Sequence, residues 1–137
     1  MGLDNGLTLY TREPIEIPED FRFDFSIENE PLKYSYEILY FRKCWNIRRE
    51  VVRALNADYE YCGKAWLTID EVKKIWWAIN EINHENVWES GSSIWTYDEI
   101  KDNLDRSLLA LEWLIGFMRE HVGDKTPFYM VEFYDSY

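Results

Sequence analysis

The residues best placed to do chemistry in this chain form a short basic stripe. Residues 42–53 hold five basic residues and one acidic residue, although the whole chain has a net charge of −11. On a helix, positions spaced by three and four residues share one face, and guanidinium groups bind phosphate or carboxylate with two parallel hydrogen bonds. The predicted anion-binding stripe consists of Arg42, Lys43, Asn46, Arg49 and Arg53. The alternative is that these cations pair with acids of the protein itself.

Metal or nucleophilic chemistry has weaker support in the sequence. The candidate soft ligands are Cys44, Cys62, His84 and His121. They stand far apart and form no Cys-x-x-Cys or closely spaced histidine pair, so we expect no metal site. No glycine-rich phosphate loop is present, and no serine or cysteine has a histidine near it in the sequence. We therefore expect no catalytic residues and no cofactor.

Aromatic residues are unusually frequent. The chain has seven Trp, ten Tyr and seven Phe among 137 residues. Adjacent helix positions point about 100° apart, so the pair Trp76-Trp77 cannot lie wholly inside. Exposed aromatic side chains often anchor protein interfaces. The predicted interface residues are Trp45, Trp77, Trp113 and Phe117, against the alternative of a large aromatic core.

Charge is unevenly distributed along the chain. Residues 1–41 carry a net charge of −6 and residues 54–137 carry −9, while residues 42–53 carry +4. A solvated acidic surface accounts for this pattern, and so does a surface that meets a basic partner, because charge of one sign steers association and repels nucleic acid. We expect a basic protein partner and no direct nucleic-acid binding.

Length and composition predict one soluble domain covering residues 1–137. No apolar run approaches the roughly 20 residues that a membrane span needs, and the first residues lack a basic and apolar leader. The two cysteines are then expected to be free thiols in a reducing compartment. These features predict a cytoplasmic location in a bacterial cell and no membrane association.

Periodicity predicts the elements that must position these residues. Residues 1–30 are typical of strands and loops, and residues 21–26 alternate apolar with polar side chains, as a half-buried strand does. Helices are expected over residues 35–55, from Thr68 to about His84 and from Thr96 to about His121. The last two begin with a Thr-x-x-Glu capping box. Residues 128–134 are predicted to form a terminal strand. The expected fold is α+β, with a small antiparallel sheet of N- and C-terminal strands packed on three α-helices.

Several short motifs resemble a family of small phage and bacterial proteins that begin Met-Gly-Leu-Asp. The matching segments are Met1–Asp4, Tyr40–Lys43, Asp58–Gly63 and the aromatic segment Phe128–Met130. Where the family carries an Asn and then a His after the Arg-Lys pair, this chain has Trp45 and Arg48. The resemblance implies a phage or prophage context and implies no activity.

These observations favour a non-catalytic, acidic binding protein of phage type. We expect it to occlude a basic host protein, such as a nucleic-acid enzyme or a defence nuclease. The alternative is binding or cleavage of a nucleotide-like anion between the basic stripe and nearby aromatic residues. Two adjoining apolar lines on the predicted last helix, the second of them at Leu109, Trp113 and Phe117, also predict a homodimer.

Overall fold

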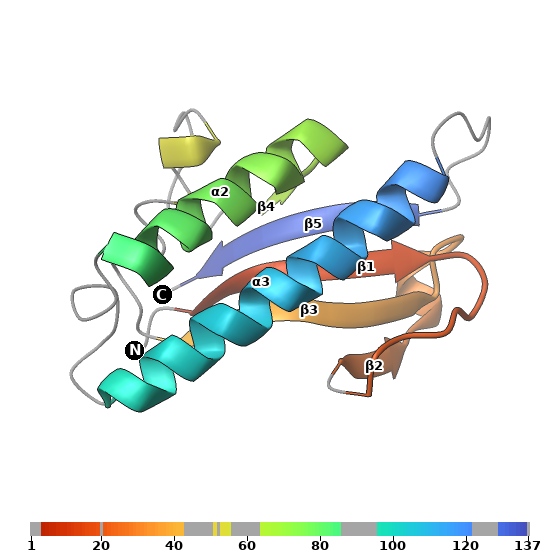
Figure 1. Ribbon diagram of the computed structural model, residues 1–137. Helices are drawn as coiled ribbons and strands as arrows, with labels where there is room; N and C mark the ends of the chain where they lie inside the picture. The colour runs from red at the N-terminus through yellow and green to blue at the C-terminus, as the bar shows by residue number, and fades with distance from the viewer. Residues whose placement is uncertain are drawn as a thin grey trace.

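The computed structural model describes residues 4–19, 21–42, 51, 53–55, 64–85, 96–121 and 129–136. Five strands and two long helices form the described part of the chain (Figure 1). The strands are β1 (Asp4–Thr11), β2 (Arg22–Phe25), β3 (Tyr34–Arg42), β4 (Lys64–Trp66) and β5 (Tyr129–Ser136). The helices are the 3₁₀ turn η1 (Ile27–Asn29), α2 (Ile69–Glu85) and α3 (Tyr97–Glu120).

The five strands form one antiparallel sheet in the order β2-β3-β1-β5-β4. The first strand lies at its centre, where Leu7 faces Leu39 of β3 on one side and Phe133 of β5 on the other. A register shift between Leu7 and Thr8 leaves Ile38 as an extra residue in β3. This bulge buries two successive side chains, Ile38 and Leu39.

Both long helices lie on the same face of the sheet, which makes a two-layer α+β domain (Figure 1). The core between the layers is apolar because alternate strand residues meet the apolar stripe of each helix. Fully buried members are Leu7, Leu9, Ile75, Ile79, Leu104, Leu111, Leu114 and Phe133. We call this helix-covered side the inner face and the other side the outer face.

The starts of α2 and α3 are as predicted. The Glu71 carboxylate accepts a hydrogen bond from the Thr68 backbone N–H at 3.0 Å, and the Glu71 N–H donates back to the Thr68 hydroxyl at 3.3 Å. Thr96 and Glu99 make the same reciprocal pair at 3.0 and 3.2 Å. These bonds satisfy N–H groups that a helix start otherwise leaves open. The terminal strand is also confirmed as β5.

The prediction of three helices is wrong. The helix expected over residues 35–55 is replaced in its first part by strand β3, which pairs with β1 and β2. Alternation of Tyr34, Tyr36 and Ile38 with polar residues suits a strand, and aromatic and β-branched residues favour one. The helical spacing of apolar residues begins only at Phe41, so the predicted helix was started too early in the chain. Further along, Val51, Arg53 and Ala54 have helical backbone.

The composition of the sheet also differs from the prediction. The sheet is not made of N- and C-terminal strands alone, because β4 from the middle of the chain pairs with β5. Neither helix of the described residues is long and apolar enough to cross a membrane.

Candidate functional site

The structure describes only the two ends of the predicted anion-binding stripe, Arg42 and Arg53. Arg42 is the last residue of β3, where it lies opposite Asp4 in β1. Arg53 is exposed on helical backbone, whereas Lys43, Asn46 and Arg49 lie outside the described residues. Arg42 therefore does not lie on one helix with Arg53, as the predicted helix over residues 35–55 implied, and anion binding by the five residues stays a prediction.

The predicted interface residues have different environments. Trp77 on α2 is exposed to 61%. Trp113 and Phe117 on α3 are half-buried: their rings stack at 5.6 Å, and Trp113 meets Phe21 edge-on at 5.2 Å. Trp45 lies outside the described residues. A partner could therefore contact more of the Trp77 ring than of the other two rings, and the role of all three in an interface stays a prediction.

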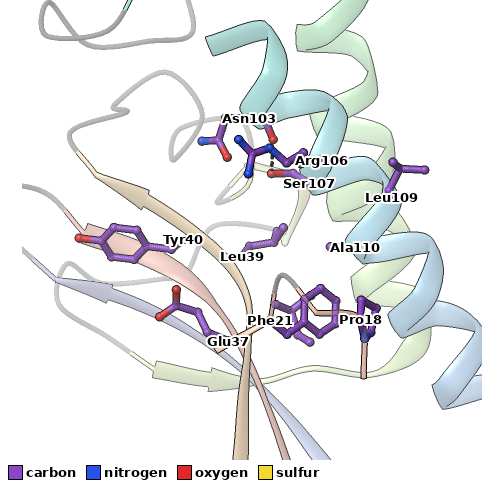
Figure 2. A pocket seen from close by; sticks show the side chains of 11 residues that line it. Pro18, Phe21, Glu37, Leu39, Tyr40, Asn103, Arg106, Ser107, Leu109 and Ala110 are labelled. Carbon is purple, nitrogen blue, oxygen red and sulfur yellow. Dashed lines mark hydrogen bonds between the residues drawn. The ribbon is translucent and has the colours of Figure 1, made fainter. Parts of the chain in front are cut away.

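An open pocket of about 440 Å³ lies between α3 and β3, and we call it the α3–β3 pocket. Figure 2 shows the α3 residues facing β3 across it, with Phe21 and Pro18 at one end. The pocket occurs here because β2 pairs with β3 only as far as Glu37. Beyond that point, no other strand of the described residues covers this edge of β3.

Two polar side chains that α3 contributes to the α3–β3 pocket are engaged within that helix. The Ser107 hydroxyl donates to the Asn103 carbonyl oxygen at 2.7 Å, as serines within helices often do. Arg106 forms an ion pair with Asp102 at 2.6 Å. The described residues that line the pocket include no His or Cys. The pocket thus offers apolar walls and solvated side chains, without a nucleophile–base pair.

A second feature is the exposed aromatic edge of the sheet, which we call the β2 surface: Phe23, Phe25 and Ile27 with the carboxylates of Asp24 and Glu28. The two Phe side chains alternate onto the inner face, opposite Tyr36 and Tyr34. They are nevertheless 54% and 49% exposed, and Ile27 is 66% exposed. The prediction of a half-buried strand is therefore correct for the strand and wrong for its burial.

Two tyrosine side chains of β3 hold the Phe rings of the β2 surface in place. Phe23 stacks on Tyr34 at 5.8 Å and lies 5.4 Å from the Tyr36 ring, and Phe25 meets Tyr34 edge-on at 5.3 Å. Tyr36 is itself buried, and its hydroxyl accepts a hydrogen bond from the Ile15 N–H at 3.2 Å. The exposed rings thus rest on an ordered aromatic layer, which limits the entropy that they would lose on binding.

The outer face of the sheet carries a row of polar and aromatic side chains. The register aligns Trp66 with Glu132, Glu132 with Thr8, and Thr8 with Glu37 across four adjacent strands. Glu132 is only 7% exposed, whereas Trp66 is 53% exposed. A carboxylate is rarely buried to this degree without a cationic partner, so the surroundings of Glu132 bear on what this face binds.

Glu132 and Trp66 both line a pocket of about 280 Å³, which we call the outer pocket. The Tyr10 hydroxyl donates to Glu132 Oε1 at a long 3.4 Å, and the Tyr10 ring meets Trp66 edge-on at 5.9 Å. Burial raises the pKa of the Tyr10 phenol, and the negative charge of Glu132 and its hydrogen bond raise it further. Residues 30–32, between η1 and β3, complete the pocket wall.

Sequence reasoning missed both surfaces. The signal for the outer pocket was a single acid, Glu132, in the otherwise apolar run Tyr129–Tyr134. The signal for the β2 surface was the shortness of strand β2, which leaves its side chains beyond the area that the two long helices cover. Neither signal identifies which face is left open, because that depends on where the helices cross the sheet.

Histidine and metal chemistry has no support among the side chains that the structure describes. His121 Nδ1 lies 2.8 Å from the Phe117 carbonyl oxygen, and its ring stacks on Phe117 at 4.3 Å. Within the described ranges, no three His, Cys, Asp or Glu side chains gather to hold a metal ion. Cys44 and Cys62 lie outside those ranges.

Comparisons of the chain with protein-family models, with curated proteins and with solved structures find no match.

Proposed function

We propose that the protein is a non-catalytic binding protein whose β2 surface covers a basic surface of a partner protein. The observation that carries this proposal is the exposure of Phe23 and Phe25 on a sheet face that is elsewhere buried under helices. Half of each ring faces water, and removing apolar area from water is the main driving force of association.

The charged residues around these two rings indicate that the partner has a basic surface. Residues 12–30 contain seven acids and two bases, so this part of the chain carries a net charge of −5. Asp24 and Glu28 are exposed beside the rings. An apolar centre with an acidic rim complements an apolar centre with a basic rim.

The position of β2 at the edge of the sheet supports the same proposal. Among the described strands, β2 pairs with β3 alone, so a partner that approaches edge-on meets the Phe side chains of the inner face and Asp24 of the outer face together. Proteins with a basic surface of this kind include enzymes that bind nucleic acid through its phosphates. A nucleic-acid enzyme or defence nuclease of a bacterial host is the partner class we propose, with the protein competing for the phosphate-binding surface.

The test begins with capture from bacterial lysate by the tagged chain, followed by direct binding measurements with the purified partner. We expect a basic partner whose affinity falls as salt rises from about 50 to 500 mM, because screening shortens the reach of the acidic rim. Changing Phe23 and Phe25 to Ser should weaken binding by at least about tenfold, as loss of an interface anchor does. Trp77→Ser removes a ring of similar exposure on α2 and tests the competing prediction that Trp77 anchors the interface; we expect a much smaller effect from it.

Charge is tested separately with a matched pair of double variants. Asp24→Lys with Glu28→Lys should slow association strongly. Glu81→Lys with Glu112→Lys makes the same change in net charge on exposed helix positions and should have a much smaller effect. A partner that is acidic, or one that binds both double variants equally, would overturn the proposal.

A further inference from the structure

The outer pocket differs from the β2 surface in position and chemistry. It lies on the outer face and is lined by the Trp66 and Tyr10 rings, which touch edge-on, and by Glu132. Its volume of about 280 Å³ is close to the lower end of the ~300–1,000 Å³ typical of small-ligand sites. It is therefore large enough for the end group of a side chain or a small organic molecule.

The charge in this pocket has one sign. Glu132 and Glu30 both line it, and no Lys, Arg or His is among the described residues of its wall. Glu132 is 93% buried, since 7% of its surface is exposed, and the hydrogen bond that it accepts from the Tyr10 hydroxyl spans 3.4 Å. Buried carboxylates are normally paired with a cation or accept several short hydrogen bonds. The outer pocket is thus arranged to receive positive charge.

The aromatic walls specify what kind of cation fits. Cations are attracted to the faces of Trp and Tyr rings within about 6 Å, and this attraction suits ammonium and guanidinium groups attached to apolar stems. Met130 and Leu32 supply apolar surface for such a stem. A hard metal ion would instead require about six oxygen ligands, and the described residues gather no group of three or more candidate ligands anywhere.

We propose that the outer pocket binds an organic ammonium or guanidinium cation, with Glu132 as the counter-charge and Trp66 and Tyr10 as the aromatic walls. The cation hydrogen-bonds the buried Glu132 carboxylate and supplies the positive charge that this group lacks among the described residues of the pocket wall. The same chemistry is offered by a free alkylamine and by a Lys or Arg side chain of another protein. The site does not depend on the β2 surface.

The test is calorimetric titration of the full chain with butylammonium, methylguanidinium and a capped lysine, and with n-butanol as the neutral isostere. We expect saturable binding of the cations and none of butanol. A basic peptide that binds at least tenfold more tightly than the capped lysine identifies a protein side chain as the source. Equal affinities identify a free amine. Absence of saturable binding by every cation, or equal binding of butanol, overturns the proposal.

Variants then locate the site. Glu132→Gln keeps the shape of the side chain and should weaken cation binding at least about tenfold. The control Glu112→Gln changes an exposed residue of α3 and should leave cation binding unchanged. Trp66→Leu should weaken binding in the same way, and Trp77→Leu, which removes a ring of similar exposure on α2, should leave it unchanged. Circular dichroism melts confirm that each variant folds. Unchanged affinity in folded Glu132→Gln contradicts the assignment.

The two proposals fail independently in these experiments. A chain with Phe23 and Phe25 changed to Ser has an altered β2 surface and an intact outer pocket, so it should bind the small cations with wild-type affinity. Loss of cation binding in that variant would overturn the placement of the site in the outer pocket.

Discussion

Two glycines in this protein should respond in opposite ways to the same substitution. Gly6 lies in the central strand β1, between Tyr40 of β3 and Tyr134 of β5. A Cβ atom added there would overlap the Leu39 carbonyl oxygen and lie 2.9 Å from the Tyr134 hydroxyl and 3.1 Å from the Leu39 carbonyl carbon. Gly116 lies in α3, where an added Cβ meets no atom within 4 Å.

The magnitudes follow from these environments. Overpacking typically costs about 1–3 kcal/mol, and Gly6→Ala belongs at the upper end because its first obstacle is backbone of the neighbouring strand rather than a rotatable side chain. Alanine recovers about 0.5–1 kcal/mol through the lower entropy of its unfolded chain. The net expectation is destabilisation by about 2 kcal/mol. Gly116→Ala should stabilise by up to about 1 kcal/mol, as Gly-to-Ala changes in helices do.

The assay is urea denaturation followed by tryptophan fluorescence and far-ultraviolet circular dichroism. The two variants should differ by about 3 kcal/mol in free energy of unfolding, with unchanged m-values. In thermal melts this difference corresponds to about 10 °C, since 1 kcal/mol shifts the melting temperature of a domain of this size by about 3 °C. A Gly6→Ala variant as stable as wild type would refute the close approach of β1 and β3, and a destabilised Gly116→Ala variant would refute the open space beside α3.

Two further predictions concern Tyr10 and self-association. The folded protein holds the pKa of Tyr10 above the unfolded value of 10.0, so its contribution to stability is complete below pH 10 and is lost as pH rises through the folded pKa. Tyr10→Phe should therefore lose less stability than wild type between about pH 10 and 12 in denaturant titrations, and an equal decline would contradict the raised pKa. For self-association, Leu109 is 67% exposed on α3, and we expect a homodimer with twice the 16.6 kDa mass of the chain in light scattering, converted to a monomer by Leu109→Asp. A mass near 16.6 kDa at all micromolar concentrations would refute the dimer.

Features that rest on neighbours a few residues apart were predictable from the sequence. The capping boxes at Thr68 and Thr96 join residues three apart, and the apolar stripe of α3 repeats every three or four residues. The alternation in β2 and the apolar run of β5 identified strands in the same way. Such signals are local, so they survive whatever the rest of the chain does.

Features that rest on distant partners were decided by the tertiary structure. Residues 35–42 carry both a strand pattern and the start of a helical one, and pairing with β1 selected the strand. The Tyr10–Glu132 hydrogen bond joins residues 122 positions apart, and no local pattern predicts it. Burial of Glu132 on the outer face likewise depends on side chains of neighbouring strands and on residues 30–32, whereas exposure of Phe23 on the inner face depends on where the helices lie. Hydrophobic periodicity states which side chains share a face, but only the placement of α2 and α3 over one side of the sheet determines which face, and how much of it, is removed from water.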